Sequence, residues 1–289
     1  MKAIAICVAT TIFVATVAAD DQKAREHVVL DRCLDSWHEK SCREAAALGF
    51  AQAALILGIM YRTGHHVLKD DEKALLWLTQ AARKGETRAQ ITLGLMFRHG
   101  DGVPQDGAQA VSWFRRAAER GNPFAQLNLG LIYSEDEVVP EDRIEALIWL
   151  NRAAEQGVLK AQLALGLLYS LGPQQDDARA AAWYRRAAEQ ADPTAEYILG
   201  MLYDEGRGVP EDPSKAVLWI RRAAEQGVAR AQFRLGVLLA EGRGVRRDAE
   251  AAIKWYRKAA RQGHQEAQDR LDMTNRGAIR VAPDNIEHL

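Results

Sequence analysis

Residue types that could carry out chemistry are sparse along this chain of 289 residues, and their spacing does not complete an active site. The sequence contains no Gly-x-Ser-x-Gly, no Ser-x-x-Lys, no phosphate loop ending in Gly-Lys-Ser/Thr and no Cys-x-x-Cys. Several loops contain Gly-x-Gly, but no strand is predicted before them. We therefore expect a protein with no catalytic residues and no cofactor.

Two groups of histidines come closest to a metal site. The segment His38-Glu39-Lys40-Ser41-Cys42 has the spacing of a zinc-binding His-Glu-x-x-His motif with Cys in the last place, but a second or third ligand is not evident. His65 and His66 are adjacent, and His99 follows one repeat later. Adjacent histidines on a loop rarely present both rings to one ion, which favours a solvated loop. The sequence therefore predicts no metal site.

The elements that would position any site come from an internal repeat. Seven positions begin successive copies at intervals of 36 residues, with one interval of 34: Gly49, Gly85, Gly121, Gly157, Ala191, Gly227 and Gly263. A period of this length is typical of helical hairpins that must stack on their neighbours to bury an apolar face. The predicted fold class is therefore all-α.

The first helix of each copy carries Ala, Leu-Gly and an aromatic residue at helical spacing, as in Ala89, Leu93-Gly94 and Phe97. Glycine inside a helix costs about 1 kcal/mol relative to alanine, so its recurrence predicts a close approach of the partner helix. The second helix carries Trp at one position in every copy: Trp77, Trp113, Trp149, Trp183, Trp219 and Trp255. We expect these rings to be buried at the contact within each hairpin.

The loop between the two helices reads Gly-x-Gly-Val-Pro-x-Asp in the second and fifth copies. Glycine is expected to end the first helix in a left-handed conformation, and Asp106 or Asp212 to cap the second. The third and fourth copies depart from this pattern at residues 136–138 and 170–177. This difference indicates a bend, a contact site or a tolerated loop variant.

The pattern Ala-Gln-x-x-Leu-Gly-x-x-Tyr, Gly-x-Gly-Val-x-x-Asp, Lys-Ala-x-x-Trp-Tyr-Arg-Lys-Ala-Ala-Glu-Gln-Gly resembles the Sel-1-like repeat family, a relative of the tetratricopeptide repeat. The resemblance covers roughly 49–275 and is nearly complete over 195–227. It implies a right-handed α/α superhelical solenoid of about six hairpins that scaffolds protein–protein contacts, often in bacterial envelopes. Some relatives carry a cysteine pair in every repeat. This chain does not, which sets it apart from members that bind penicillin-like compounds.

The ends of the chain define the remaining predicted segments. Residues 1–19 have the features of a secretory signal peptide, with Lys2 at the start, an apolar stretch and small residues before Asp20; a first buried helix is the alternative. Cys7 would be lost with this peptide, and no membrane span would remain. We expect a capping helical segment at 20–48, the repeats with a terminal capping helix at 49–275, and a loosely held tail at 276–289.

Cys33 and Cys42 remain after the expected cleavage, in a compartment that permits disulfides. One continuous helix would hold them about 13 Å apart along its axis, too far to bond. Ser36 and Glu39 have the spacing of a capping box, which predicts a turn between them. We predict a disulfide that closes an N-terminal helical hairpin; two unpaired thiols are the alternative.

Charge does not identify a partner, since 38 Lys and Arg balance 39 Asp and Glu. Nothing favours nucleic acid, whose binders usually present a basic face. Arginine pairs recur in the second helix at 115–116, 185–186 and 221–222, followed by Glu119, Glu189 and Glu225. We interpret them as a solvated face with ion pairs at helical spacing.

The resemblance implies that the first helices line a concave groove. Its positions outside the core vary between copies, with apolar residues and basic edges suited to an acidic segment, although drift on an idle surface would vary equally. The candidate partner-binding residues are Gln52, Arg62, Arg88, Arg98, Asn128, Lys160, Tyr197, Arg230, Phe233 and Arg234.

We expect a monomeric, non-enzymatic scaffold or adaptor that is periplasmic or secreted and binds a protein or peptide segment. The resemblance implies regulation of a sensor, a wall enzyme or an assembly machine. One alternative is a secreted effector or host-interaction factor. A hydrolase of cell-wall material or β-lactams is a further alternative, but it lacks the required catalytic groups.

Overall fold

The computed structural model describes residues 27–134, 140–171 and 175–275, and these residues form helices joined by short loops, without a strand. The chain divides into two compact units, Met1–Trp149 and Leu150–Leu289, and the division falls inside one helix. The predicted signal peptide at 1–19, Cys7, the tail at 276–289 and the altered loop at 136–138 lie outside the described residues. The predicted all-α class is confirmed.

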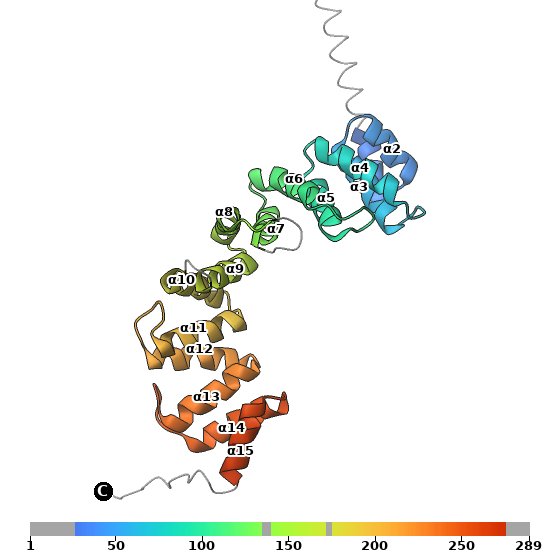
Figure 1. Cartoon of the computed structure of the whole chain (residues 1–289). Coiled ribbons are helices and arrows are strands. Elements are labelled where there is room, and N and C mark those ends of the chain that lie inside the picture. Colours follow the sequence, from blue (N-terminus) through green and yellow to red (C-terminus); the bar gives the residue numbers. More distant parts are fainter. Residues whose placement is uncertain (1–26, 135–139, 172–174, 276–289) are drawn as a thin grey trace, which may run out of the picture. The chain divides into compact units, whose positions relative to one another are not determined.

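Helices alternate as the first and second members of successive hairpins. The first helices are α3 (Ala51–Thr63), α5 (Thr87–His99), α7 (Pro123–Ser134), α9 (Leu159–Ser170), α11 (Pro193–Glu205) and α13 (Ala229–Glu241). The second helices are α4 (Asp71–Arg83), α6 (Gly107–Glu119), α8 (Arg143–Glu155), α10 (Asp177–Glu189), α12 (Pro213–Glu225) and α14 (Ala249–Arg261). A helical segment at 27–36 and α2 (Glu39–Ala47) precede the first hairpin, and α15 (Gln265–Asn275) follows the last. Within each unit, consecutive helices pack against one another in chain order (Figure 1).

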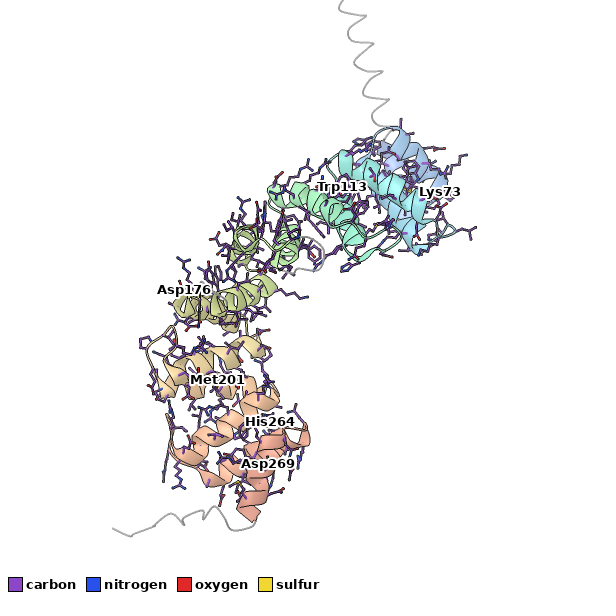
Figure 2. All side chains as sticks on the ribbon, in the orientation of Figure 1. Lys73, Trp113, Asp176, Met201, His264 and Asp269 are labelled. Carbon is purple, nitrogen blue, oxygen red and sulfur yellow. A yellow bond between two sulfur atoms is a disulfide. The ribbon has the colours of Figure 1, made fainter. Side chains whose placement is uncertain are left out.

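The helix ends follow the predicted capping chemistry. Asp106 and Asp212 begin α6 and α12, and each side chain accepts a hydrogen bond from the backbone N–H three residues later, at 3.0 Å. Asp176, labelled in Figure 2, caps α10 in the same way. Gly100 and Gly206 end α5 and α11 in the left-handed conformation. These contacts satisfy backbone groups that a helix end leaves unpaired.

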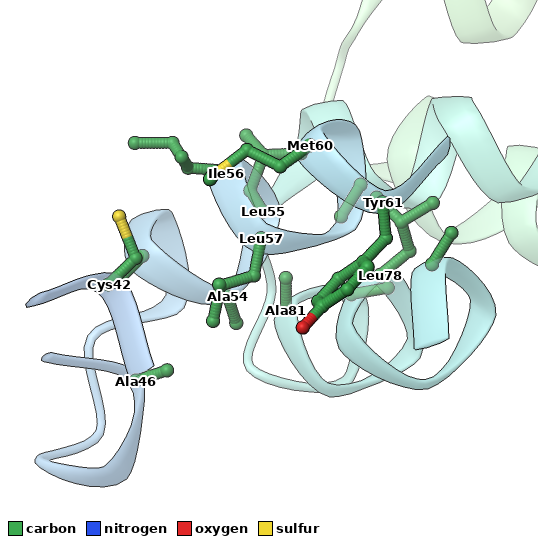
Figure 3. Packing of buried hydrophobic residues seen from close by; sticks show 14 of the residues in the cluster. Cys42, Ala46, Ala54, Leu55, Ile56, Leu57, Met60, Tyr61, Leu78 and Ala81 are labelled. Atoms are coloured by element: carbon green, nitrogen blue, oxygen red, sulfur yellow. The ribbon is translucent and has the colours of Figure 1, made fainter. Parts of the chain in front are cut away.

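In α3, α5, α9, α11 and α13, the glycine in the middle of the first helix faces a large side chain of the second helix. A Cβ atom added at Gly94 would lie 2.8 Å from the ring of Phe114, and one at Gly166 would lie 2.7 Å from the ring of Tyr184. Gly58 faces Leu78 in the same way, and Figure 3 shows Leu78 among the buried residues of the first hairpin. The predicted close approach of the two helices is therefore confirmed.

The side chain at this contact is the residue after each tryptophan, not the tryptophan. Phe114 is fully buried, and so are Leu78 and Ile220 at the equivalent position, whereas Trp77, Trp183 and Trp219 are only partly buried. Successive residues of a helix point about 100° apart, so only one of two adjacent bulky residues can face the glycine. Trp113 and Trp149 are buried as expected, with 8% and 4% of their surface exposed, but the position that faces the glycine belongs to the next residue.

Hydrogen bonds join the start of a hairpin to its end. The residue that follows a second helix donates to the carbonyl oxygen of the position that opens the same copy, as in Gln226 Nε2 to Ala191 O (3.3 Å) and Gln262 Nε2 to Gly227 O (3.0 Å). The opening position has a positive φ in each copy, including 60° at Ala191, where the other copies have glycine. Alanine pays a steric cost of about 1 kcal/mol in this conformation.

The predicted disulfide is present at the N-terminal end. Cys33 and Cys42 are bonded, both are fully buried, and their Cα atoms lie 4.7 Å apart. The turn between them differs from the expected capping box, because Ser36 Oγ donates to Arg32 O at 2.6 Å and His38 occupies the N-cap position of α2 without a side-chain bond. Trp37 makes the reversal instead, with φ of 49°.

We predict that Gly94→Ala destabilises the protein by about 1–3 kcal/mol, because the added methyl group would overlap the Phe114 ring. Helix propensity alone predicts the opposite, a gain of about 1 kcal/mol. Urea unfolding followed by far-ultraviolet circular dichroism measures the difference. Phe114→Ala provides the control, because the double variant should lose less stability than the sum of the two single variants. A more stable Gly94→Ala variant would show that the close contact does not hold the hairpin.

Candidate interaction surface

Four of the candidate partner-binding residues lie exposed on the first helices. Gln52 of α3, Arg88 of α5, Lys160 of α9 and Arg230 of α13 occupy the same position in the first turn of their helices, and each is exposed. We call these four residues the first-helix row. Their side chains are not needed for packing, so the row is accessible to a partner.

Three other candidates hold neighbouring hairpins together. Arg62 Nη1 lies 3.2 Å from Asp101 Oδ2, which belongs to the next loop. Arg98 Nη1 donates to Asn128 Oδ1 at 3.4 Å, and Asn128 is itself buried and donates to Phe124 O. Replacing any of these residues would disturb packing between hairpins.

Arg234 takes part in a denser network around a buried carboxylate. Asp204 of α11 is 1% exposed, and its side chain pairs with Arg234 of α13 and with Arg243, whose Nε lies 2.9 Å from Asp204 Oδ1. Arg243 also reaches Glu211 at 3.0 Å. A buried charge is tolerated when it is paired in this way, and removal of one partner is costly. Arg234 is therefore tied to the preceding hairpin.

The two aromatic candidates are also engaged within the chain. Tyr197 and Phe233 are half-buried and pack against the core of the second unit. The Phe233 ring stacks on His264 with centroids 4.7 Å apart. Desolvation by burial raises the pKa of Tyr197. Neither ring is presented to solvent as an open binding face.

The arginine pairs of the second helices contact aromatic side chains, which differs from the predicted solvated face with ion pairs at helical spacing. The first arginine reaches the next hairpin: Arg115 Nη2 donates to Tyr133 Oη and Arg185 Nη2 donates to Tyr203 Oη, each at 2.9 Å. The second stacks on the tryptophan three residues earlier, as Arg116 does on Trp113 at 4.7 Å from the ring centroid (Trp113 is labelled in Figure 2). The cations thus contact aromatic groups, since indole faces attract guanidinium groups.

The histidine groups do not assemble a metal centre in the described part of the chain, where no cluster of three His, Cys, Asp or Glu residues could hold an ion. Cys42 is bonded to Cys33, so it cannot complete a zinc set with His38. His65 and His66 have ring centroids 4.0 Å apart and line a cleft of about 670 Å³ with Trp37.

A buried glutamine recurs in the first helices, and its structural role was not predicted from the sequence. Gln90, Gln126, Gln162 and Gln232 are buried, and each Nε2 donates to the carbonyl oxygen eight residues earlier, at 3.0–3.2 Å. The signal was the Gln that follows the repeated Ala. Its role was hidden because glutamine is usually exposed.

Glu196 replaces this glutamine in α11. It is 2% exposed and accepts a hydrogen bond from Gln226 Nε2 at 2.7 Å, with Arg222 Nε 4.0 Å away. Desolvation by burial raises the pKa of Glu196 above its usual value, although Gln226 and Arg222 oppose that shift. An ionised carboxylate has no proton to donate, so it cannot make the bond that the glutamines make.

The comparisons with known proteins place these features in a family. A family model described as Sel1 repeat matches residues 51–86, 87–122, 123–158, 159–192, 193–228 and 229–264. The comparison with curated proteins gave no match. Among the described residues, every helix is too short or too polar to cross a membrane.

Two solved structures resemble the chain over most of its length. One is a protective antigen from uropathogenic Escherichia coli strains that displays an SLR fold; it is 38% identical over 82% of this chain and 52% of that chain, with a TM-score of 0.74. The other is a Sel1 repeat protein from Oxalobacter formigenes, 35% identical over 88% of this chain and 86% of that chain, with a TM-score of 0.55. The chain spans about half the length of the Escherichia coli protein.

We predict that Glu196→Gln stabilises the protein near neutral pH by about 1 kcal/mol, because it restores an amide donor and removes a buried charge. A carboxyl whose folded pKa is raised contributes stability below its unfolded pKa and loses that contribution as pH rises through the folded pKa. The advantage of the variant should therefore shrink as pH is lowered towards about 4. Thermal midpoints across this range measure it.

Glu189→Gln serves as the control, because it removes a carboxylate at an exposed position of the neighbouring helix. A stabilisation that is independent of pH, or equal in the two variants, would contradict a special role for burial at Glu196.

Proposed function

Because the chain belongs to the Sel1 repeat family, we propose that it is a non-enzymatic scaffold or adaptor of the bacterial cell envelope that binds a segment of a partner protein. Sel1-repeat proteins are generally protein-interaction scaffolds and typically lack enzymatic activity. The observation that carries the proposal is the first-helix row, which is exposed while the surrounding columns are committed to packing.

Charge and shape support a partner segment with acidic residues. Arg88, Lys160 and Arg230 place three cations at one repeated position, and Gln52 adds an amide. Within one unit, an extended or helical segment can contact equivalent positions of the hairpins in succession. The protein would act as a monomer, and binding would regulate a sensor, a wall enzyme or an assembly machine.

The disulfide supports an envelope location. Buried disulfides persist in oxidising compartments such as the periplasm and are rare in the bacterial cytosol. Cys33 and Cys42 are bonded and fully buried, which agrees with the export expected from residues 1–19.

A host-interaction role is the second candidate. It is favoured by the likeness to the protective antigen of uropathogenic Escherichia coli, since a protective antigen is a protein that host immunity recognises. Cell fractionation distinguishes the two: retention in the periplasm supports the envelope scaffold, and release into the medium supports the host-directed role.

We predict that the combined variant Arg88→Glu, Lys160→Glu and Arg230→Glu loses capture of its partner by about tenfold, since three favourable charge contacts become repulsive. In-cell crosslinking followed by affinity purification and quantitative mass spectrometry measures the captured protein. Thermal unfolding should change little, because these side chains are exposed.

The matched control is the triple variant Arg83→Glu, Arg246→Glu and Arg261→Glu, in which Arg230 is unchanged. It makes the same change in charge at exposed positions outside the first-helix row. Equal capture by both triple variants would reject the first-helix row as the binding site.

A further inference from the structure

Cations gather on the second helices of the C-terminal unit although the whole chain is nearly neutral. Each of α10, α12 and α14 carries two adjacent cations, directly after the residue that faces the glycine: Arg185 and Arg186, Arg221 and Arg222, Arg257 and Lys258. Because the hairpins repeat the same geometry, equivalent positions lie on the same face of the stack.

The second member of each pair is held against a tryptophan. Arg186 lies 4.6 Å from the centroid of Trp183, Arg222 lies 4.9 Å from that of Trp219, and Lys258 lies 3.9 Å from that of Trp255. We call Arg186, Arg222 and Lys258 the cation row. Ring contact orients each charged group before a partner arrives, which lowers the entropy cost of ordering a long side chain.

The cation row remains open to solvent. All three side chains are exposed, and Arg222 keeps 53% of its side-chain surface accessible despite its 4.0 Å approach to Glu196. This differs from the first helices of the same unit, where Arg234 is bound to buried Asp204. The first helices of this unit also expose Lys160 and Arg230, but among its described residues only the second helices hold exposed cations against tryptophan rings.

Acidic and apolar groups flank the cation row. Glu189 and Glu225 lie three residues further along α10 and α12, and both are exposed. Leu218, beside Trp219, is 54% exposed. A uniform polyanion such as nucleic acid would be repelled by the glutamates, whereas a polypeptide can place acidic, basic and apolar side chains opposite matching groups.

We propose that the second-helix face of the C-terminal unit docks an acidic polypeptide segment, whose Asp and Glu side chains pair with the cation row. This inference rests on the proposed function of protein binding but assigns it a second, separate surface. Successive carboxylates of the segment would meet Arg186, Arg222 and Lys258 in turn, and its apolar side chains would contact Leu218 and the tryptophan edges.

Fluorescence anisotropy with the full chain tests the proposal. The probes are a labelled peptide of about 20 residues in which Glu and Asp alternate with Leu and Ala, and a single-stranded oligonucleotide of equal charge. The cation-row variant is Arg186→Glu, Arg222→Glu and Lys258→Glu. The matched control is Arg246→Glu, Arg247→Glu and Arg270→Glu, which makes the same change in charge at exposed positions of the same unit outside the cation row and the first-helix row.

We expect the peptide to bind the wild-type chain and to bind the cation-row variant about tenfold more weakly, while the control changes by about twofold or less. Binding should weaken as salt rises from about 50 mM, because exposed charges are screened. Unchanged thermal midpoints verify that both variants fold.

Three results would overturn the proposal: no peptide binding by the wild type, equal binding by the cation-row variant, or tighter binding of the oligonucleotide than of the peptide. If the peptide binds the wild type and the cation-row variant equally, the acidic segment belongs on the first-helix row, and the proposed function stands without this second surface.

Discussion

In every hairpin with a described contact, the first helix approaches the second so closely that one methyl group on its central glycine would overlap the facing side chain. This approach fixes which residue of the second helix enters the core. It also sets the depth at which the next hairpin must pack, because each hairpin is too small to bury its own apolar face. In the first, second, fifth and sixth copies, a left-handed glycine ends the first helix and an aspartate caps the second, so the chain reverses at the same place.

The packing leaves two kinds of surface, and they differ in how their charges are used. On the first helices, Arg62, Arg98 and Arg234 form polar contacts with the neighbouring hairpin. On the second helices, tryptophan rings hold cations in place while leaving them accessible. Arginine therefore joins neighbouring hairpins at some positions of both helices, as Arg234 and Arg185 do, and stays exposed at others, as Arg230 and Arg186 do.

The fold could be predicted from the sequence because the repeat period, the caps and the cysteine spacing are local patterns. The exposure of the candidate partner-binding residues could be predicted only in part, and their role in binding stays a prediction. Gln52, Arg88, Lys160 and Arg230 lie exposed as expected, but the pairing of Arg234 with Asp204 joins residues 30 apart, which no local pattern reveals. Tryptophan and its neighbour share the same period as well, so periodicity cannot say which of them faces the glycine.

Three departures from the repeat pattern occur together at the junction that opens the fifth copy. Ala191 has a positive φ, whereas the equivalent residue of the other copies is glycine. Glu196 occupies the position at which other copies bury a glutamine. The preceding copy, residues 159–192, is two residues shorter than its neighbours. In a linear array, cooperativity passes only through nearest neighbours. We therefore expect amide protons of the residues around Ala191 and Glu196 to exchange faster than those at the equivalent positions of the other junctions.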